Sequence, residues 1–248
     1  MLRCFIADLH IHTCLSPCAD LTMSPKRVIE KALEKNLNII GVCDHNSAEN
    51  VVAAKNVALK KKIAVLAGME VSSVEEVHVI ALFDDVSLVL KLQKIVYESL
   101  PLEENKEEYF GQQIIANEFD EIEGYNKKLL ISATTLTLKR IIYEIHNLGG
   151  LAIAAHIDRE SYSVIGQLGF IPQDLEFDAL ELSPNISESK ALDRFPEIKE
   201  FPLISSSDAH FLKDIGKSTT SFFLNEPTIY EIQNALKKID GRSFSLKG

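Results

Sequence analysis

Short apolar runs alternate with amphipathic stretches along the first third of the chain. The runs have the length and composition of buried strands, and they occupy residues 3–7, 37–43, 63–68 and 77–83. Apolar residues recur at helical spacing in 24–36 and 48–62, and the first of these begins with Ser24 as N-cap and Pro25 in the first turn. This βαβα order predicts a parallel sheet covered by helices.

The alternation stops between about residues 84 and 135. A helical pattern at 85–100 ends before Pro101, a charged stretch follows, and 111–133 has the pattern of an antiparallel hairpin. We expect this segment to be an insertion that carries a lid or a substrate-shaping element.

The alternation then resumes. Amphipathic helices are expected at 137–150, which closes with Gly149 and Gly150, and at 228–238. Further apolar runs are expected to form strands at 151–156, 178–183, 201–210, 220–225 and 243–246. Since the chain contains no internal repeat and no linker-like stretch, residues 1–248 predict a single barrel-like α/β domain of seven or so strands.

Imidazoles and carboxylates gather where the predicted strands end. They are Asp8, His10, His12, Asp44, His45, Glu70, His156, Asp208 and His210, and His78 opens a strand. Functional groups of parallel α/β folds collect at this edge of the sheet. His10 and His12, like Asp208 and His210, are two residues apart, so in extended chain each pair faces one side. Such a mixture of ligands suits zinc, iron or manganese.

Charge and length restrict the partners. The 248 residues carry a formal net charge of −10 and no dense basic tract, which disfavours long nucleic acid and favours a small ligand in a locally positive pocket. No apolar run reaches the ~20 residues of a membrane span. The start "MLRCFIADLH" is too short for a signal peptide, so we expect a soluble, cytoplasmic protein.

The cysteines do not form a recognisable framework. There are four in 248 residues, and Cys14 and Cys18 form a C-x3-C spacing with no second pair, which argues against disulfides and against a structural zinc site. We expect free, buried thiols. Cys18 stays open as a metal ligand.

The order of these motifs resembles a known family. "DLHIHT", "GVCDHNS", "GMEV" with "VHVIAL", "AAHIDR" and "SSDAH" are similar to the motifs of the polymerase and histidinol phosphatase (PHP) superfamily, and they extend from Asp8 to His210. The resemblance implies a distorted (β/α)7 TIM-like barrel that binds two or three divalent ions and has phosphoesterase activity.

The resemblance also implies which residues bind each ion. The first ion would be held by His10, His12, Glu70 and Asp208. The second would share Glu70 and add His78 and His156. The third would be bound by His45 and His210, with one further ligand from a loop that is longer here than in the family. Asp20 is expected to be that ligand, with Cys18 as the alternative, and Asp44 would hold a ligand imidazole in place.

This ligand set implies a hydrolytic reaction. The positive charge of three divalent ions would exceed the negative charge of Glu70, Asp208 and Asp20 by about +3. The pocket would therefore attract phosphate although the protein is acidic. Metal-activated hydroxide would attack phosphorus, and His210 is the candidate that protonates the leaving group. Arg159 would bind a substrate phosphate, with a surface ion pair as the equal alternative.

Other charged residues have simpler interpretations. His146 lies inside an amphipathic helix and is expected to be structural, and Arg194, Lys213 and Lys217 are weaker phosphate candidates. The predicted function is a metal-dependent phosphoesterase acting on a small phosphorylated metabolite or nucleotide. A nuclease that trims short oligonucleotides and a non-catalytic metal-binding module remain the alternatives. Monoester or diester preference and oligomeric state stay open.

Overall fold

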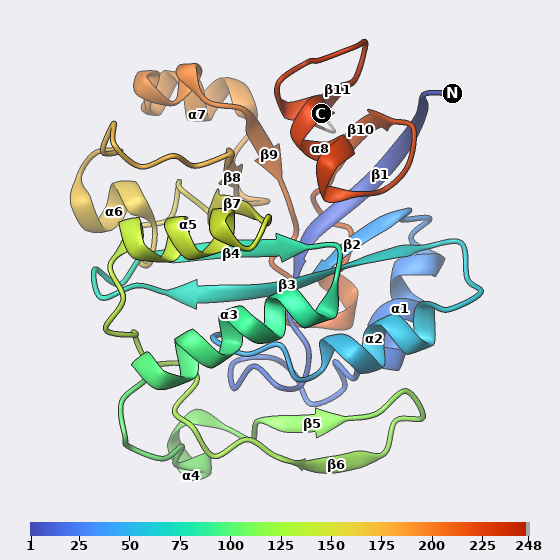
Figure 1. Cartoon of the computed structure of the whole chain (residues 1–248), viewed down its shortest axis with the longest axis vertical. Helices are drawn as coiled ribbons and strands as arrows, with labels where there is room; N and C mark the ends of the chain where they lie inside the picture. The colour runs from blue at the N-terminus through green and yellow to red at the C-terminus, as the bar shows by residue number, and fades with distance from the viewer. Residues whose placement is uncertain (247–248) are drawn as a thin grey trace.

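A nine-stranded sheet, curved into a nearly closed barrel, forms the centre of the computed structural model, which describes residues 1–246 (Figure 1). The strand order is β11-β10-β1-β2-β3-β4-β7-β8-β9, and the two outermost strands, β9 and β11, contact each other. The strands are β1 Arg3–Ile11, β2 Ile39–Val42, β3 Ala64–Ser72, β4 His78–Phe83, β7 Leu151–Ala154, β8 Ala179–Leu182, β9 Leu203–Ser205, β10 Thr220–Leu224 and β11 Ser243–Leu246. The α/β barrel-like fold expected from the sequence is confirmed.

The sheet is mixed, and the expectation of a parallel sheet is wrong in part. β1, β2 and β3 are parallel, as are β7, β8 and β9, but β4 runs antiparallel to both β3 and β7. A turn of only a few residues joins β3 to β4, which is too short for the crossover that a parallel pair requires. Ser72 therefore pairs with His78, and the start of β4 lies at the edge where β3 ends.

Helices cover the outside of this sheet (Figure 1). α3 packs on β3 and β4 and α5 packs on β4 and β7, whereas α8 contacts β10 and β11 and joins the apolar cluster of the inner strand faces. Ser24 caps α1 by accepting from the backbone N–H of Arg27, and Pro25 stands in the first turn, as expected. The helices are α1 Pro25–Glu34, α2 Val51–Ala58, α3 Val86–Ser99, α4 Glu107–Phe110, α5 Leu138–Asn147, α6 Val164–Leu168, α7 Glu188–Arg194 and α8 Ile229–Leu236, with 3-10 turns η1 Pro196–Glu200 and η2 Leu212–Asp214.

The segment at 84–135 divides into two parts. Its helix α3 belongs to the layer that covers the sheet, whereas β5 (Ile114–Ala116) and β6 (Ile122–Tyr125) pair into a separate hairpin below α3 in Figure 1. Ile114 and Ala116 of this hairpin pack on Cys14, in the loop that follows β1. The hairpin thus supports the loop that carries Cys18.

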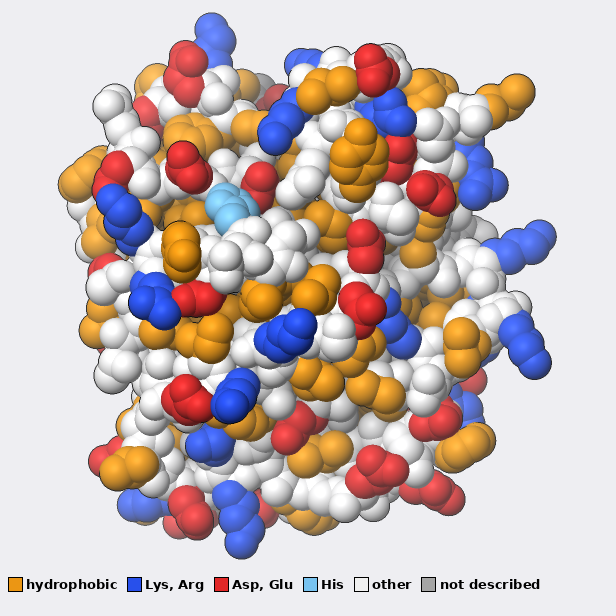
Figure 2. All heavy atoms as spheres, in the orientation of Figure 1, with side chains coloured by type: hydrophobic (Ala, Val, Ile, Leu, Met, Phe, Trp, Pro, Cys, Tyr) orange, Lys and Arg blue, Asp and Glu red, His pale blue; other side chains and the backbone are white. Residues whose placement is uncertain are grey.

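The surface gives little direct indication of a partner. On the face in Figure 2, Lys and Arg side chains are interspersed with Asp and Glu. Among residues 1–246 there is no helix with the length and apolar character needed to span a bilayer.

Candidate metal centre

Six segments bring their imidazoles and carboxylates to one edge of the sheet. They are the end of β1, the loop after β2, the end of β3, the start of the antiparallel β4, the turn after β7 and the loop after β9. The side chains involved are His10, His12, His45, Glu70, His78, His156, Asp208 and His210, and all but His210 are buried. His78 belongs to this group only because β4 is antiparallel.

Glu70 lies at the middle of the group. Its Oε1 is 2.9 Å from His78 Nδ1 and 3.3 Å from His156 Nε2. Its Oε2 is 3.0 Å from His45 Nδ1 and 3.4 Å from His12 Nε2. One carboxylate therefore faces imidazoles from four different segments, as a carboxylate shared between two ions would.

Asp208 and the two histidines of β1 form a second cluster beside Glu70. Asp208 Oδ1 lies 3.0 Å from His12 Nε2 and 3.4 Å from His10 Nε2, and the two Nε2 atoms are 3.1 Å apart. Ligand atoms at ~2.1 Å from one ion are separated by roughly 3.0–3.4 Å for angles between 90° and tetrahedral. The observed separations have this size.

The backbone that orients these side chains departs from regular geometry. A bulge shifts the register between β1 and β2, so that Asp8 pairs with Ile40 but Ile11 pairs with Val42. Gly41 lies opposite the bulge, and a Cβ on it would be 2.2 Å from the carbonyl oxygen of Leu9.

Two of the clustered residues also have backbone conformations that L-residues seldom adopt. His156 and Asp208 have φ values of 29° and 49°. Such strained residues gather at functional sites, where the surrounding structure holds them in place.

Outer hydrogen bonds select the ring nitrogen that faces the centre. The Nδ1 of His10 lies 3.1 Å from Glu181 Oε1, and the Nδ1 of His210 donates to the carbonyl of Asp208. In the neutral form of each ring, the proton is therefore on Nδ1 and the lone pair is on Nε2.

His12 is oriented in the same way, through a serine. Ser16 Oγ donates to Asp44 at 2.6 Å and so accepts from the Nδ1 of His12 at 2.9 Å. Asp44 thus orients an imidazole as expected, but indirectly. Its other contacts are with the backbone N–H and the hydroxyl of Thr13.

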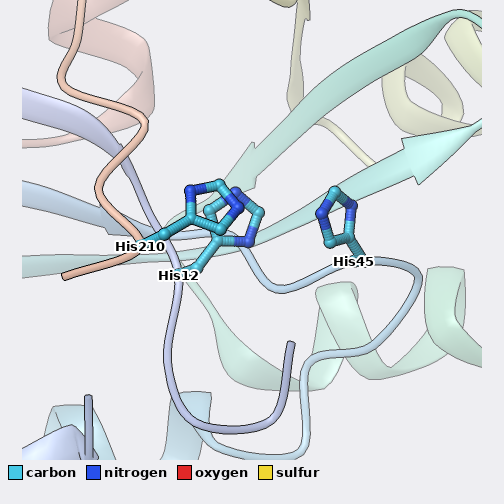
Figure 3. Close-up of side chains that lie close together, drawn as sticks. All are labelled: His12, His45 and His210. Atoms are coloured by element: carbon cyan, nitrogen blue, oxygen red, sulfur yellow. The ribbon is translucent and has the colours of Figure 1, made fainter. Parts of the chain in front are cut away.

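A third cluster is formed by His12, His45 and His210 (Figure 3). The ring of His210 stacks on that of His12 with centroids 4.2 Å apart, and His45 approaches from the loop after β2. Cys18 Sγ lies 3.1 Å from His210 Nε2. His45 also lies in a group with Glu70 and His78. It therefore borders the position expected for the second ion and not only that of the third.

The structure does not bring Asp20 into this cluster. Its carboxylate accepts from the backbone N–H and the hydroxyl of Thr22, at 2.9 Å and 2.5 Å, and is open to solvent. The carboxylate is thus bonded within its own loop and does not contact His45 or His210 in this structure. The expectation for Asp20 is therefore corrected, and the side chain of this loop that faces His210 is Cys18.

The electrostatics keep the carboxylates ionised. Burial disfavours ionisation of Glu70 and Asp208, but the surrounding imidazoles outweigh it and hold the pKa of both well below the usual range. Burial disfavours protonation of His10, but the charges of Glu181 and Glu70 raise its pKa well above the usual range. Neighbouring protein atoms partly desolvate Cys18 and oppose its ionisation, yet His45 and His210 lower its pKa to about 6. Such anionic ligands attract cations.

Several buried polar atoms lack hydrogen bonds among the described residues. Four of them belong to the residues of the centre, namely His45 Nδ1, His78 Nδ1, His156 Nδ1 and Glu70 Oε2, and all but His156 Nδ1 belong to atom pairs about 3 Å apart. Buried polar groups are ordinarily satisfied. Atoms of this kind, in a cluster of imidazoles and carboxylates, fit divalent ions well.

The sequence motifs alone missed Glu181. It is fully buried in β8 and contacts both the His10 ring and, at 3.2 Å, the backbone N–H of His156. Its signal was available, since "DALELS" has one carboxylate inside an otherwise apolar strand. Asp8 has a purely positioning role, because it accepts from the backbone N–H groups of Ser207 and Gly216.

The structure also shows the surroundings of Arg159, of His146 and of the four cysteines. Arg159 forms an ion pair with Asp208 at 2.6 Å, and His146 lies on α5, where it pairs with Asp178 at 2.9 Å. Cys14 and Cys43 are buried as expected, but Cys4 and Cys18 are exposed, which corrects the expectation of four buried thiols.

The sequence of the chain matches two family profiles. The profile described as the PHP domain matches residues 8–176, and the one described as PHP-associated matches residues 193–240. The chain belongs to the PHP family. The resemblance drawn from the motifs is confirmed, and with it the enzyme class, a hydrolase of phosphate esters.

Several proteins are similar to this PHP chain. A 5'-3' exoribonuclease of Haemophilus influenzae is 24% identical over 188 residues, which cover 60% of this chain and 68% of the relative. The lesion-specific endonuclease PfuEndoQ of Pyrococcus furiosus matches with a TM-score of 0.74 and 22% identity, over 98% of this chain and 58% of that one. The PHP chain therefore spans little more than half of PfuEndoQ.

Other solved structures share the fold. An endonuclease Q in complex with a 27-mer duplex that has an abasic lesion matches with a TM-score of 0.72 and 20% identity, over 97% of this chain and 58% of that one. A two-domain protein from Bacteroides vulgatus, containing a predicted PHP-like metal-dependent phosphoesterase, matches with a TM-score of 0.58 and 16% identity, over 99% of this chain and 65% of that one.

Proposed function

We propose that this PHP chain hydrolyses phosphate esters at a centre of two or three divalent ions, zinc, manganese or iron. The observation that carries the proposal is the convergence of eight imidazole and carboxylate side chains from six segments. Their atoms are about 3 Å apart, which suits ligands of the same metal ion. The ordered outer hydrogen bonds support it, because they leave the inner nitrogens free.

The residues of the chain have separate tasks in this proposal. Bound divalent ions supply a hydroxide nucleophile near neutral pH and neutralise charge on the phosphoryl oxygens. Glu70 and Asp208, both ionised, would bind the ions. Arg159, with 39% of its side chain exposed, extends from Asp208 toward solvent, where its guanidinium can bind a substrate phosphate.

The contacts of His210 favour one of its two expected roles. Its Nδ1 donates to the carbonyl of Asp208 and its Nε2 faces Cys18 Sγ, so both ring nitrogens are engaged. We therefore assign His210 to metal binding. Protonation of the leaving group then comes from water at the open side of the centre.

The shape of the site favours a substrate larger than one phosphate. The cavity over the centre has a volume of about 190 Å³, and a neighbouring cavity of about 570 Å³ shares Arg159 and Tyr162 with it. Arg194 also lines the second cavity, together with the carboxylates of Asp158 and Glu160. Tyr162 stacks on His78 at 4.7 Å and is 47% exposed, so its ring offers a surface for a nucleobase.

We therefore favour a phosphodiester of a nucleotide or a short oligonucleotide as the substrate. The names of similar proteins, an exoribonuclease and lesion-specific endonucleases, support the same class. Of the sequence-based expectations, this choice keeps the nucleotide and adopts the alternative of a short oligonucleotide in place of a small phosphorylated metabolite. The argument from net charge against nucleic acid is also weaker. A substrate phosphate meets the local charge of the metal centre and not the net charge of the whole protein.

A substrate panel tests the proposal. The protein, loaded with manganese or zinc, is incubated with p-nitrophenyl phosphate, bis-p-nitrophenyl phosphate, short RNA and DNA oligonucleotides, and a duplex with an abasic site. We expect faster hydrolysis of oligonucleotides than of the monoester. Hydrolysis of the monoester alone would contradict the substrate class, and bound metal without turnover of any ester would favour a non-catalytic module.

Variants of the two arginines locate the substrate. Arg159→Ala should raise KM about tenfold for every ester with metal content intact, because a bidentate charged contact is lost. Arg194→Ala should raise KM for oligonucleotides but not for bis-p-nitrophenyl phosphate, which is too small to reach it. Lys213→Ala is the matched control, since Lys213 lies over the ring of Phe211 and lines neither cavity.

A further inference from the structure

Cys18 lies where a ligand of the third cluster is needed. Its Sγ is 3.1 Å from His210 Nε2, and it lines the same cavity as His45 and His210. A sulfur ligand at ~2.3 Å and a nitrogen ligand at ~2.05 Å of one zinc ion are separated by roughly 3.1–3.6 Å. The observed separation falls at the short end of this range.

The loop that carries Cys18 is fixed on both sides of it. Two residues earlier, Ser16 Oγ contacts His12, Asp44 and the backbone N–H of His45. Two residues later, the backbone N–H of Asp20 donates to the carbonyl of His210 at 2.9 Å. The thiol is therefore held against the imidazoles by bonds to the same residues that form the cluster.

The imidazoles themselves point to a ligand between them. His45 is 95% buried, and its Nδ1 lies 3.0 Å from Glu70 Oε2, so its ring stands between Glu70 and the third cluster. One ring nitrogen each of His12, His45 and His210 lie within 4.8 Å of one another. The proton of His210 is on Nδ1, so the lone pair of Nε2 faces the thiol.

We propose that Cys18 binds the third ion of the centre together with His45 and His210, and that its sulfur makes this position select zinc over manganese or magnesium. The inference rests on the proposed metal centre and adds the identity of one ligand. Thiolate is a soft ligand that suits zinc, whereas manganese and magnesium prefer oxygen. The sequence left the choice between Asp20 and Cys18 open, and the contacts of the loop favour the cysteine.

Cobalt reports on this ligand directly. Metal-free protein is titrated with Co²⁺, and absorbance is followed at the thiolate-to-cobalt charge-transfer band in the near ultraviolet. The wild type and Cys4→Ser should show the band, and Cys18→Ser and Cys18→Asp should lack it. Cys4 is the matched control, because it is exposed but lies at the far end of β1. Zinc content measured by mass spectrometry should fall by one ion per chain in Cys18→Ser.

Metal selectivity and thiol protection give further readouts. Cys18→Asp should bind manganese in place of the zinc that is lost, because it exchanges sulfur for oxygen. In the Cys4→Ser background, zinc should slow the reaction of Cys18 with a disulfide reagent at least about tenfold, since a bound thiolate is a poor nucleophile. Circular dichroism of each variant confirms that it is folded.

The outcomes separate the ligand from the reaction. An equal cobalt band in Cys18→Ser, or bound cobalt without any band in the wild type, would overturn the role of Cys18 and leave phosphoester hydrolysis standing. A band that depends on Cys18, in a protein that hydrolyses no ester, would support the ligand and overturn the proposed function. A wild type that binds no cobalt or zinc would overturn both.

Discussion

At the scale of single residues, the chemistry of the centre depends on pairs of side chains. Each imidazole from the motifs has an inner atom that faces the cluster, and several have an outer partner that fixes the ring, such as Glu181 for His10 and Ser16 for His12. The inner members are recognisable from residue type and spacing. The outer partners come from other strands and loops, so spacing along the chain does not reveal them.

The first prediction concerns the inner members. His12→Ala and Asp208→Asn should each abolish hydrolysis, by more than about 100-fold, and lower the metal content, because each removes a ligand that faces His10 at 3.1 or 3.4 Å. Metal per chain and turnover are measured together. His146→Ala is the control, since His146 pairs with Asp178, just before β8, and not with a residue of the centre. Undiminished turnover in the first two variants would remove them from the centre.

The second prediction concerns an outer partner. Glu181→Gln should weaken metal binding by about 10–100-fold, because the neutral amide no longer holds the Nδ1–H of His10 with a charged acceptor. Isothermal titration with zinc measures the change, and thermal stability of the metal-free protein should change far less. Glu144→Gln is the matched control, since Glu144 is a buried glutamate whose partner is Arg140 on α5. Equal zinc affinities would show that Glu181 only fills space.

At the scale of elements, strand ends position the ligands, and local irregularities aim them. The bulge in β1 turns His10 and His12 toward the centre, and Gly41 on β2 makes room for it. The antiparallel direction of β4 returns the chain so that its first residue, His78, faces Glu70 at the end of β3.

The third prediction tests the bulge. Gly41→Ala should destabilise the protein by about 1–3 kcal/mol and reduce metal content, because the new methyl group would overlap the Leu9 carbonyl and force the bulge to move. Urea denaturation measures the stability. Gly124→Ala on the β5–β6 hairpin, where a Cβ would meet nothing within 4 Å, should change stability little. Equal losses of stability and metal content in both variants would show that the bulge does not position the centre.

At the scale of the whole molecule, the centre is where distant parts of the barrel meet. Ionised Glu70 and Asp208 and the nearby Glu181 are buried together, and the guanidinium of Arg159 pairs with Asp208. Buried charges of one sign destabilise the fold unless cations compensate them. Metal binding should therefore stabilise the entire barrel.

The fourth prediction follows from this balance. Zinc at about 100 times its dissociation constant should stabilise the protein by about 2.7 kcal/mol for each ion bound, and chelation by EDTA should lower Tm correspondingly. Differential scanning calorimetry with and without chelator measures the effect. Asp208→Asn should show a smaller shift. An unchanged Tm after complete metal removal would mean that ions contribute nothing to folding.

Much of this protein was predictable from the order of its residues. The alternation of apolar runs and amphipathic stretches indicates an α/β barrel, and it does so because strand and helix periods are local properties. The motifs and their positions at strand ends indicate a metal-dependent hydrolase, because residue type and spacing can also be taken directly from the chain. The structure brings together His10, His12, His45, Glu70, His78, His156, Asp208 and His210, as those positions led us to expect.

Only the tertiary structure decided the place of Glu181 and which side chain of the loop after β1, the Cys18 thiol or the Asp20 carboxylate, faces His210. Each depends on contacts between residues far apart in the chain. The path of the loop after β1 follows from the bond of Asp20 to His210 and from the packing of Cys14 on Ile114. Residue type states what a side chain can bind, whereas the packing of distant segments determines what it meets.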